Sequence, residues 1–180
     1  MLFRPCCINI YLFTGVLALL ATGCTSPSPS KDGKEAKEGK RVQSAIRLHL
    51  AVNPHPATSS MRVNVGRSDP LPVNVESVAF LTELLVEKAS VVDGLGGFSI
   101  NLQFNSDGAI LLEQYTGAYK GRRMAIAAEF GQSRWIAAPV IRQRITDGQF
   151  VFTPDLSREE ADRFVRGLNR VAELVRKGRK

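Results

Sequence analysis

Sulfur and imidazole ligands are scarce in this chain of 180 residues, which has three cysteines and two histidines. Because Cys6, Cys7 and Cys24 all lie in the first 24 residues, the rest of the chain can form no disulfide and has no cysteine nucleophile. We expect His49 on a polar or half-buried strand face and His55 in a loop between prolines. Neither has partners at the Cys and His spacings that are typical of zinc sites. We therefore predict no metal site and no cofactor.

Motifs for catalysis and phosphate binding are also missing. The sequence has no G-x-S-x-G nucleophile elbow. The glycine-rich stretch NSDGAILLEQYTGAYKGRRMAIAAEFG, residues 105–131, matches neither the Walker loop nor the dinucleotide-binding pattern. Its GAYKGRR segment follows a predicted helix, whereas phosphate-binding N–H groups lie at the start of a helix. The sequence therefore favours a protein that is not an enzyme.

Positive charge is unevenly distributed along the chain. The net charge is +7, yet residues 42–156 contain ten basic and ten acidic side chains, and residues 157–180 contain eight and four. The excess in the folded part therefore lies in one segment rather than over a general basic surface. We predict no nucleic-acid partner.

The first residues have the pattern of an export signal. Arg4 precedes a mostly apolar run from Ile8 to Leu20, which is too short to span a bilayer comfortably and fits the apolar region of a signal peptide. The following LLATGC resembles the lipobox of bacterial lipoproteins, which implies lipidation at Cys24 and a lipid anchor in a membrane of the cell envelope. An ordinary signal peptide, cut between Ala21 and Cys24, and a retained N-terminal anchor are the alternatives.

The remaining chain divides into a linker and one domain. Residues 24–41 contain TSPSPSKDGKEAKEGKR, which has too little apolar surface to offset the entropy of ordering and predicts a flexible tether. We expect residues 1–23 to be the signal peptide and residues 42–180 to form a single domain, facing the periplasm or the exterior.

Within the domain, the pattern predicts an α+β fold with a largely antiparallel sheet backed by two helices. The predicted strands are rich in branched or alternating apolar residues and cover 44–52, 61–65, 86–92, 98–104, 123–130, 134–140 and 148–153. Residues 73–85 are ambiguous between a strand followed by a turn and a short helix. The segments 86–92 and 98–104 should pair as a hairpin, because the apolar residues of the latter alternate with polar ones.

Two helices are predicted, and the longer one is C-terminal. The first covers residues 109–115 after an N-cap at Asn105 or Ser106. The second begins with Ser157 and Glu160 at capping-box spacing and ends at Gly178. Its predicted buried face has the 3.6-residue period of an amphipathic helix and comprises Ala161, Phe164, Val165, Leu168, Val171, Ala172 and Val175.

Five arginines are candidates for contact with a partner. Arg122 and Arg123 follow the first helix, and Arg163, Arg166 and Arg170 lie on the polar face of the second. A purely solvated face is the alternative, since Glu159–Arg163, Asp162–Arg166 and Glu173–Lys177 are spaced for ion pairs along a helix.

From about residue 70 to residue 176 the sequence resembles the head subdomain of the first periplasmic domain of SecD, a bacterial protein-export membrane protein. No single residue carries the resemblance. It depends on an ordered set over about 80 residues: Asp107–Gly108, Thr116, Gly121–Arg122, Ala125–Ile126, Ala138–Pro139, Ile145, Gly148 and residues 157–161.

The resemblance implies a head domain that contacts emerging polypeptide and carries no catalytic residues. SecD has several membrane spans and a base subdomain, and neither is expected here, so we expect a stand-alone head on a lipid tether. The predicted partners are the membrane, unfolded polypeptide and components of the translocon. A scaffold or assembly subunit of another envelope complex, with no export role, is the alternative.

Replacing Cys24 tests the predicted lipid anchor. Cys24→Ser should abolish metabolic labelling with fatty acid and release the protein from the membrane fraction, because the thiol is the predicted attachment point. Unchanged labelling and fractionation would show that lipidation does not occur at Cys24.

Overall fold

The computed structural model describes residues 43–54 and 59–178 of the chain. The predicted signal peptide, the tether and His55 lie outside the described residues. No helix in this part of the chain is both long enough and apolar enough to cross a membrane.

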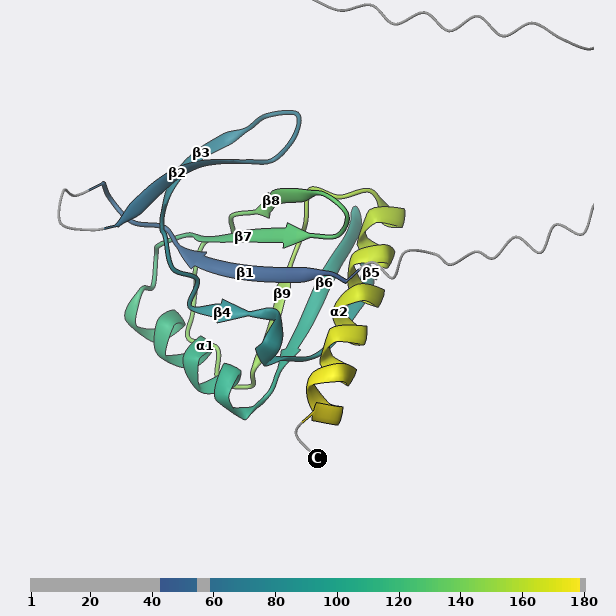
Figure 1. Ribbon diagram of the computed structural model, residues 1–180. Coiled ribbons are helices and arrows are strands. Elements are labelled where there is room, and N and C mark those ends of the chain that lie inside the picture. The colour runs from purple at the N-terminus through teal and green to yellow at the C-terminus, as the bar shows by residue number, and fades with distance from the viewer. Residues whose placement is uncertain (1–42, 55–58, 179–180) are drawn as a thin grey trace, which may run out of the picture. The chain divides into compact units, whose positions relative to one another are not determined.

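The elements follow the predicted order (Figure 1). The strands are β1 (Ala45–Leu50), β2 (Ser60–Val65), β3 (Leu71–Glu76), β4 (Leu81–Thr82), β5 (Val86–Gly94), β6 (Gly97–Phe104), β7 (Met124–Glu129), β8 (Ser133–Ala137) and β9 (Gln149–Phe152). The helices are a 3-10 turn η1 (Glu83–Leu85) and two α-helices, α1 (Ser106–Ala118) and α2 (Arg158–Gly178). The ambiguous segment 73–85 therefore contains most of β3, a turn, β4 and η1.

The described strands form three antiparallel sheets, which confirms the α+β class. A four-stranded sheet has the order β4-β1-β7-β8, a three-stranded sheet has the order β5-β6-β9, and β2 and β3 form a separate two-stranded arm. The predicted hairpin is correct: β5 pairs with β6 from Val86–Phe104 to Gly94–Gly97. In Figure 1, β6 and β9 pass behind the four-stranded sheet, and the arm extends from it.

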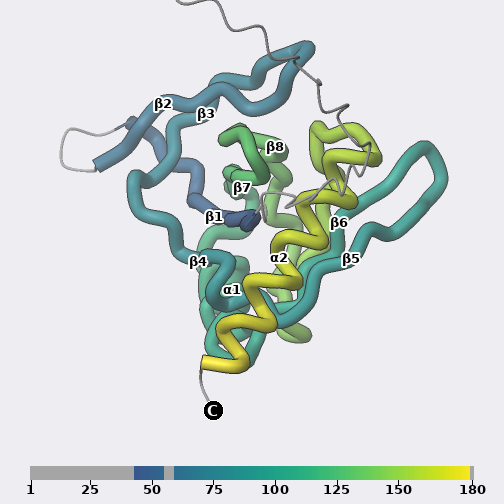
Figure 2. The backbone as a smooth tube through the Cα atoms, turned by 45° about the vertical axis from the view of Figure 1, so that its right-hand side comes forward, coloured from purple at the N-terminus to yellow at the C-terminus, as the bar shows by residue number. Residues whose placement is uncertain are grey.

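One large apolar core joins the two larger sheets and both α-helices. Strands β1 and β6 contribute alternate side chains, such as Leu48 and Leu102, because successive residues of a strand face opposite sides. Helix α2 packs along β5 (Figure 2). It contributes Phe164 and Leu168, which are both buried. The predicted buried face of α2 is therefore correct in its first half. Towards its C-terminal end, Val171, Ala172 and Val175 are only half-buried.

A glycine in α2 allows the chain to enter the domain. Gly167 packs directly against Ser44, and a Cβ atom at position 167 would lie only 2.7 Å from the Cβ of Ser44. No larger residue fits there without moving the start of β1 away from α2.

The structure differs from the predictions in several details. Helix α1 is longer than the predicted 109–115, and Ile110, which we expected to add apolar mass, is mostly exposed. His49 is buried, although it lies on the outer face of its strand. The three ion pairs for which the residues of α2 are spaced are absent among the described residues, and Asp162 pairs with Arg158 rather than with Arg166.

The packing of α2 predicts a large loss of stability for Leu168→Asp. Leu168 is buried in the core, so the substitution leaves an unpaired charge there and should lower the free energy of unfolding by about 3–5 kcal/mol. Leu174→Asp on the same helix is the control and should change it by only about 0.5 kcal/mol, because Leu174 is half exposed. Chemical denaturation measures both values. Equal effects would contradict the observed orientation of α2.

Candidate peptide-binding groove

A groove of about 1190 Å³ lies between β9 and the segment 138–148. Residues 149–153 form one side, and the residues that connect β8 to β9 form the other. Val151, with 56% of its surface exposed, lies on the β9 side, and Val140 lies opposite. The groove is therefore bordered by an edge strand and by exposed apolar side chains.

The backbone of β9 has one unpaired side. The amide of Phe104 donates to the carbonyl of Gly148, and β9 pairs with β6 through Leu102–Phe150 and Ile100–Phe152. Antiparallel hydrogen bonding alternates along a strand, so the N–H and C=O groups of Val151 point away from β6. Because β9 has no other neighbour in its sheet, these groups are available to an incoming strand.

The opposite edge of the same sheet is covered by α2, and one side chain of this helix bonds to the backbone of β5. The amide of Asn169 on α2 accepts a hydrogen bond from the Ala89 N–H at 2.8 Å and donates one to the Ala89 carbonyl at 2.9 Å. Asn169 therefore occupies the position on β5 that a further strand would take. Of the two edges of this sheet, the edge at β9 is the open one.

Helix α1 holds the far wall of the groove. The hydroxyl of Thr116 accepts a hydrogen bond from the Ile145 amide at 3.0 Å and donates one to the Leu112 carbonyl at 2.7 Å. Arg144 forms an ion pair with Glu113, which lies in α1 about one turn before Thr116. Gly148 has a φ of +66°, and a Cβ there would lie 2.8 Å from the Cβ of Ala109, so the start of β9 fits tightly against α1. The groove is thus built on a fixed wall.

The groove is weakly basic. Arg123, Arg142 and Arg144 line it together with a single acid, Asp147. Arg123 is partly engaged, since its guanidinium donates to the Ala138 carbonyl at 2.8 Å. The site therefore offers backbone hydrogen bonds, apolar contacts and some positive charge, a combination that suits an extended polypeptide.

The five arginines predicted from the sequence fall in two separate places. Arg123 lines the groove, and the guanidinium of Arg122 stacks over the ring of Tyr119 at 5.5 Å. Arg163, Arg166 and Arg170 are exposed on α2, which Figure 1 shows on the other side of the domain from the start of β7. The structure does not unite them in one site.

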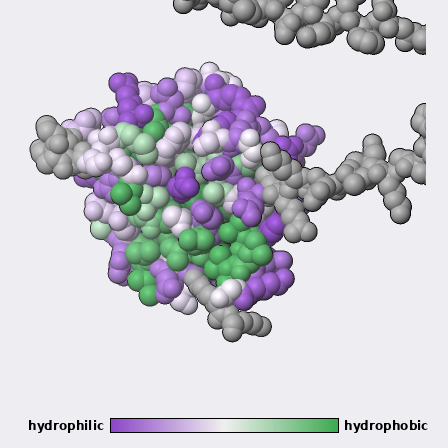
Figure 3. All heavy atoms as spheres, viewed as in Figure 1, coloured by the Kyte–Doolittle hydropathy of each residue, from purple (hydrophilic) through white to green (hydrophobic). Residues whose placement is uncertain are grey.

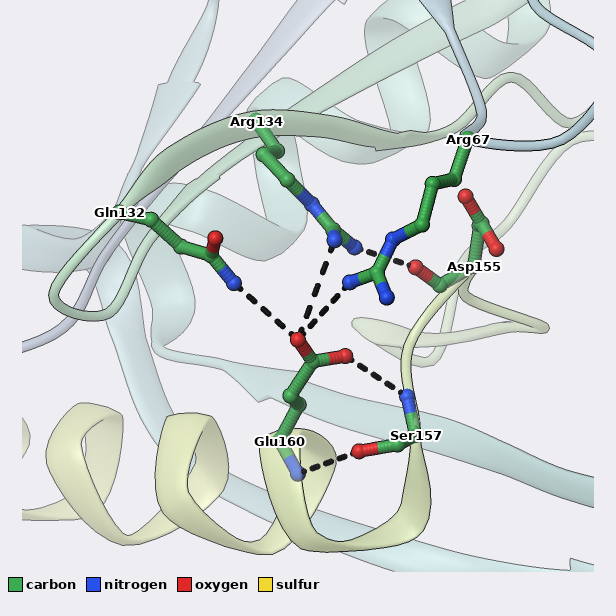
Figure 4. Close-up of polar contacts among 6 residues, drawn as sticks. All are labelled: Arg67, Gln132, Arg134, Asp155, Ser157 and Glu160. Carbon is green, nitrogen blue, oxygen red and sulfur yellow. Dashed lines mark hydrogen bonds and ion pairs between the residues drawn. The ribbon is translucent and has the colours of Figure 1, made fainter.

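A polar cluster joins α2 to two distant turns (Figure 4). Glu160 and Ser157 form the predicted capping box: the Ser157 amide donates to Glu160 Oε2 at 2.8 Å, and the Glu160 amide donates to Ser157 Oγ at 3.2 Å. Oε1 of Glu160 also accepts from Arg67 at 2.9 Å and from Gln132 at 3.1 Å. The Ser157 hydrogen bond, followed by the contacts with Arg67, lowers the pKa of Glu160 below its usual 4.5.

A second hollow, of about 540 Å³, lies between the β2–β3 arm and the outer face of the four-stranded sheet. His49 lines it, contacts the edge of Trp135, and places Nδ1 2.8 Å from the Glu76 carbonyl oxygen. Burial lowers the pKa of His49. The ring therefore ties the arm to β1 rather than standing in a constellation of metal ligands. Among residues 43–54 and 59–178, no three His, Cys, Asp or Glu side chains are grouped to hold a metal.

Comparison with known proteins identifies the domain. The family model of the SecDF P1 head subdomain matches residues 60–172, which is more than half of the chain. The chain therefore belongs to the SecDF P1 head subdomain family. This range contains the whole groove and most of α2, and it excludes β1.

Individual relatives agree with this assignment. The protein translocase subunit SecDF of Thermus thermophilus is 39% identical over 77 residues, which are 43% of this chain and 10% of that protein. A solved structure of SecDF, described as a membrane component that enhances protein export, covers 82% of this chain and 71% of its own at 22% identity and a TM-score of 0.54. SecDF in its super-membrane-facing form covers 72% and 19% at 23% identity and a TM-score of 0.51. At these identities the solved structures show a shared fold. The matched part of the chain spans about a tenth of the length of the Thermus thermophilus protein.

The lowered pKa of Glu160 predicts that the free energy of unfolding decreases at acidic pH. Because the folded carboxyl has a lowered pKa, its contribution is complete above pH 4.5 and is lost as the pH falls through the lowered value. Glu160→Gln should lower the free energy of unfolding at pH 7 by about 1 kcal/mol and flatten this acid dependence. Urea denaturation between pH 7 and pH 3 measures both effects.

Glu159→Gln is the matched control, because this exposed carboxylate lies in the same first turn of α2. It should keep the acid dependence of the wild type. An unchanged pH profile in Glu160→Gln would contradict the role given to the cluster.

Proposed function

We propose that this protein is a lipoprotein of the cell envelope whose head domain binds extended, unfolded polypeptide and assists protein export. The observation that carries the proposal is the open edge of β9 beside a groove, in a domain of the SecDF P1 head family. A relative described as enhancing protein export supports the link to export.

Binding would occur by strand addition. An extended chain lying in the groove receives one hydrogen bond from the Val151 N–H and donates one to its carbonyl, in the same way as a neighbouring strand. Backbone hydrogen bonds are independent of sequence, which suits a domain that must accept many different polypeptides. Val140 and Val151 supply apolar contacts, and Arg142 supplies positive charge at the rim.

Attachment to the membrane completes the proposal. Lipidation at Cys24 would anchor the chain, and a tether of residues 24–41 would span on the order of 20–25 Å on average. The domain then stays near the translocon without being fixed to it, which raises the local concentration of the groove where precursors emerge. Translocon components are the proposed protein partners.

Removing one backbone donor tests the edge of β9. Val151→Pro should weaken binding of a fluorescently labelled unfolded precursor by roughly twofold to tenfold, because proline takes away one hydrogen bond to the added strand. Proline is tolerated on a strand edge whose N–H faces away from the sheet, so the melting temperature should change little. Fluorescence anisotropy with the detergent-purified chain measures the affinity.

Val151→Thr keeps the N–H group and the branched shape, and it should bind as the wild type does. Equal affinity in the proline variant would place the polypeptide elsewhere. A wild-type chain that binds no precursor, and that recovers other envelope proteins but no translocon subunits after crosslinking in cells, would contradict the export role and favour the scaffold alternative.

A further inference from the structure

An apolar patch lies exposed where η1 meets the C-terminal half of α2. Its members are Leu84 of η1 and Leu174 of α2, each 53% exposed, and Val171, which is half-buried and lies one turn before Leu174. We call these three residues the η1–α2 patch. Figure 3 shows apolar surface gathered over this part of the domain and bordered by hydrophilic surface.

The patch arises where α2 extends beyond the core: Val171 continues the apolar stripe of the helix, and Leu174 lies about 60° to one side of Val171. Phe164 and Leu168 are buried against the sheets, whereas Val171 and Leu174 are one to three turns further along and are only partly covered. Leu84 in η1 adds to this surface from the segment against which α2 packs. The patch is therefore not needed to complete the fold of the domain.

Positive charge lies on the α2 side of the patch. At 100° per residue, Arg170 and Arg163 lie within about 40° of Leu174 around the helix, one turn and three turns before it. On the other side, the acids Glu83 and Glu87 are close to Leu84 in the sequence. The acids Glu160 and Asp162 are engaged by Arg67 and Arg158. Within residues 158–178, the basic side chains without an ion pair to another described residue are Arg163, Arg166, Arg170, Arg176 and Lys177. In the same range, the acidic side chains without an ion pair to another described residue are Glu159 and Glu173.

The N-terminal part of the chain enters the domain on the same side. Ser44 packs against Gly167, which lies within about 20° of Leu174 around the helix. The chain therefore enters the domain against α2, two turns before Leu174. An anchor in the N-terminal segment would keep the domain, and this face with it, near the membrane.

We propose that the η1–α2 patch and its arginines dock the domain on an anionic phospholipid surface. Leu84, Val171 and Leu174 enter the boundary between headgroups and acyl chains, and Arg163, Arg166 and Arg170 contact lipid phosphates. Three side chains form too small a surface for a stable dimer, which usually buries 600 Å² or more on each partner. The docking relies on the proposed N-terminal attachment only for a high local concentration.

Docking in this way leaves the peptide groove accessible. None of the residues that line the groove belongs to η1 or α2. The membrane-bound domain would therefore hold its open β9 edge towards the aqueous side while α2 lies on the lipid. The arginines of α2 acquire a role that is separate from polypeptide binding.

Fluorescence quenching by lipid tests this orientation in the full chain. The sequence has a single tryptophan, so Trp135→Phe gives a silent background. In that background Leu174→Trp is reconstituted into vesicles of brominated phosphatidylglycerol and phosphatidylcholine. The indole at position 174 should lose most of its emission, and the loss should be smaller in vesicles of brominated phosphatidylcholine alone. Attachment by lipid or by an uncleaved N-terminal segment serves equally, so the readout does not depend on lipidation.

Val151→Trp is the matched control, because Val151 is exposed to a similar extent and lies on β9. Its indole should keep its emission in both kinds of vesicle. Arg163→Gln with Arg170→Gln should reduce quenching at position 174 while precursor binding is unchanged. Equal quenching at both positions, or equal quenching in both lipids, would overturn the proposal. Protection of position 174 from lipid and from aqueous acrylamide alike would also overturn it and identify a protein, such as a second copy, as the occupant.

Discussion

The carboxylate of Glu160 connects three parts of the described chain that are far apart in sequence. It caps α2 through Ser157, accepts a hydrogen bond from Arg67 in the connection between β2 and β3, and accepts another from Gln132 in the turn between β7 and β8. Two further contacts fix α2 along its length, Gly167 against Ser44 and Asn169 on the backbone of Ala89. Together they determine the rotation of the helix, and hence which side chains are buried and which face outward.

This rotation explains the separation of surfaces. Because Asn169 faces β5, α2 covers that edge of the three-stranded sheet and leaves β9 as the open one. The same orientation turns Leu174 and the arginines away from the core. Peptide binding and membrane docking are therefore proposed for different faces, each created by what α2 covers and what it leaves exposed.

Local features of the fold could be predicted from the sequence. The alternation of Phe98 to Phe104 predicts a half-buried strand, and Ser157 with Glu160 predicts a helix start, since both signals depend on neighbouring residues. The partners of Glu160 could not be predicted in the same way, because Arg67 and Gln132 reach it only through the tertiary fold. His49 was expected to be no more than half-buried, but the β2–β3 arm, which no local signal positions, covers it. The groove escaped prediction because residues 138–148 resemble an ordinary connection. The exposed Val151 between the buried Phe150 and Phe152 was its only signal.

The position of β1 has a mechanical consequence. The chain enters the domain just before Ala45, and β1 lies between β4 and β7, with six residue pairs to β7. A pull on the N-terminal segment along the strand direction would load these pairs together in shear, and the pairs with β4 on the other side of β1 would share the load. A domain held from its N-terminus is thus attached through the strand best placed to bear force while it holds a moving polypeptide.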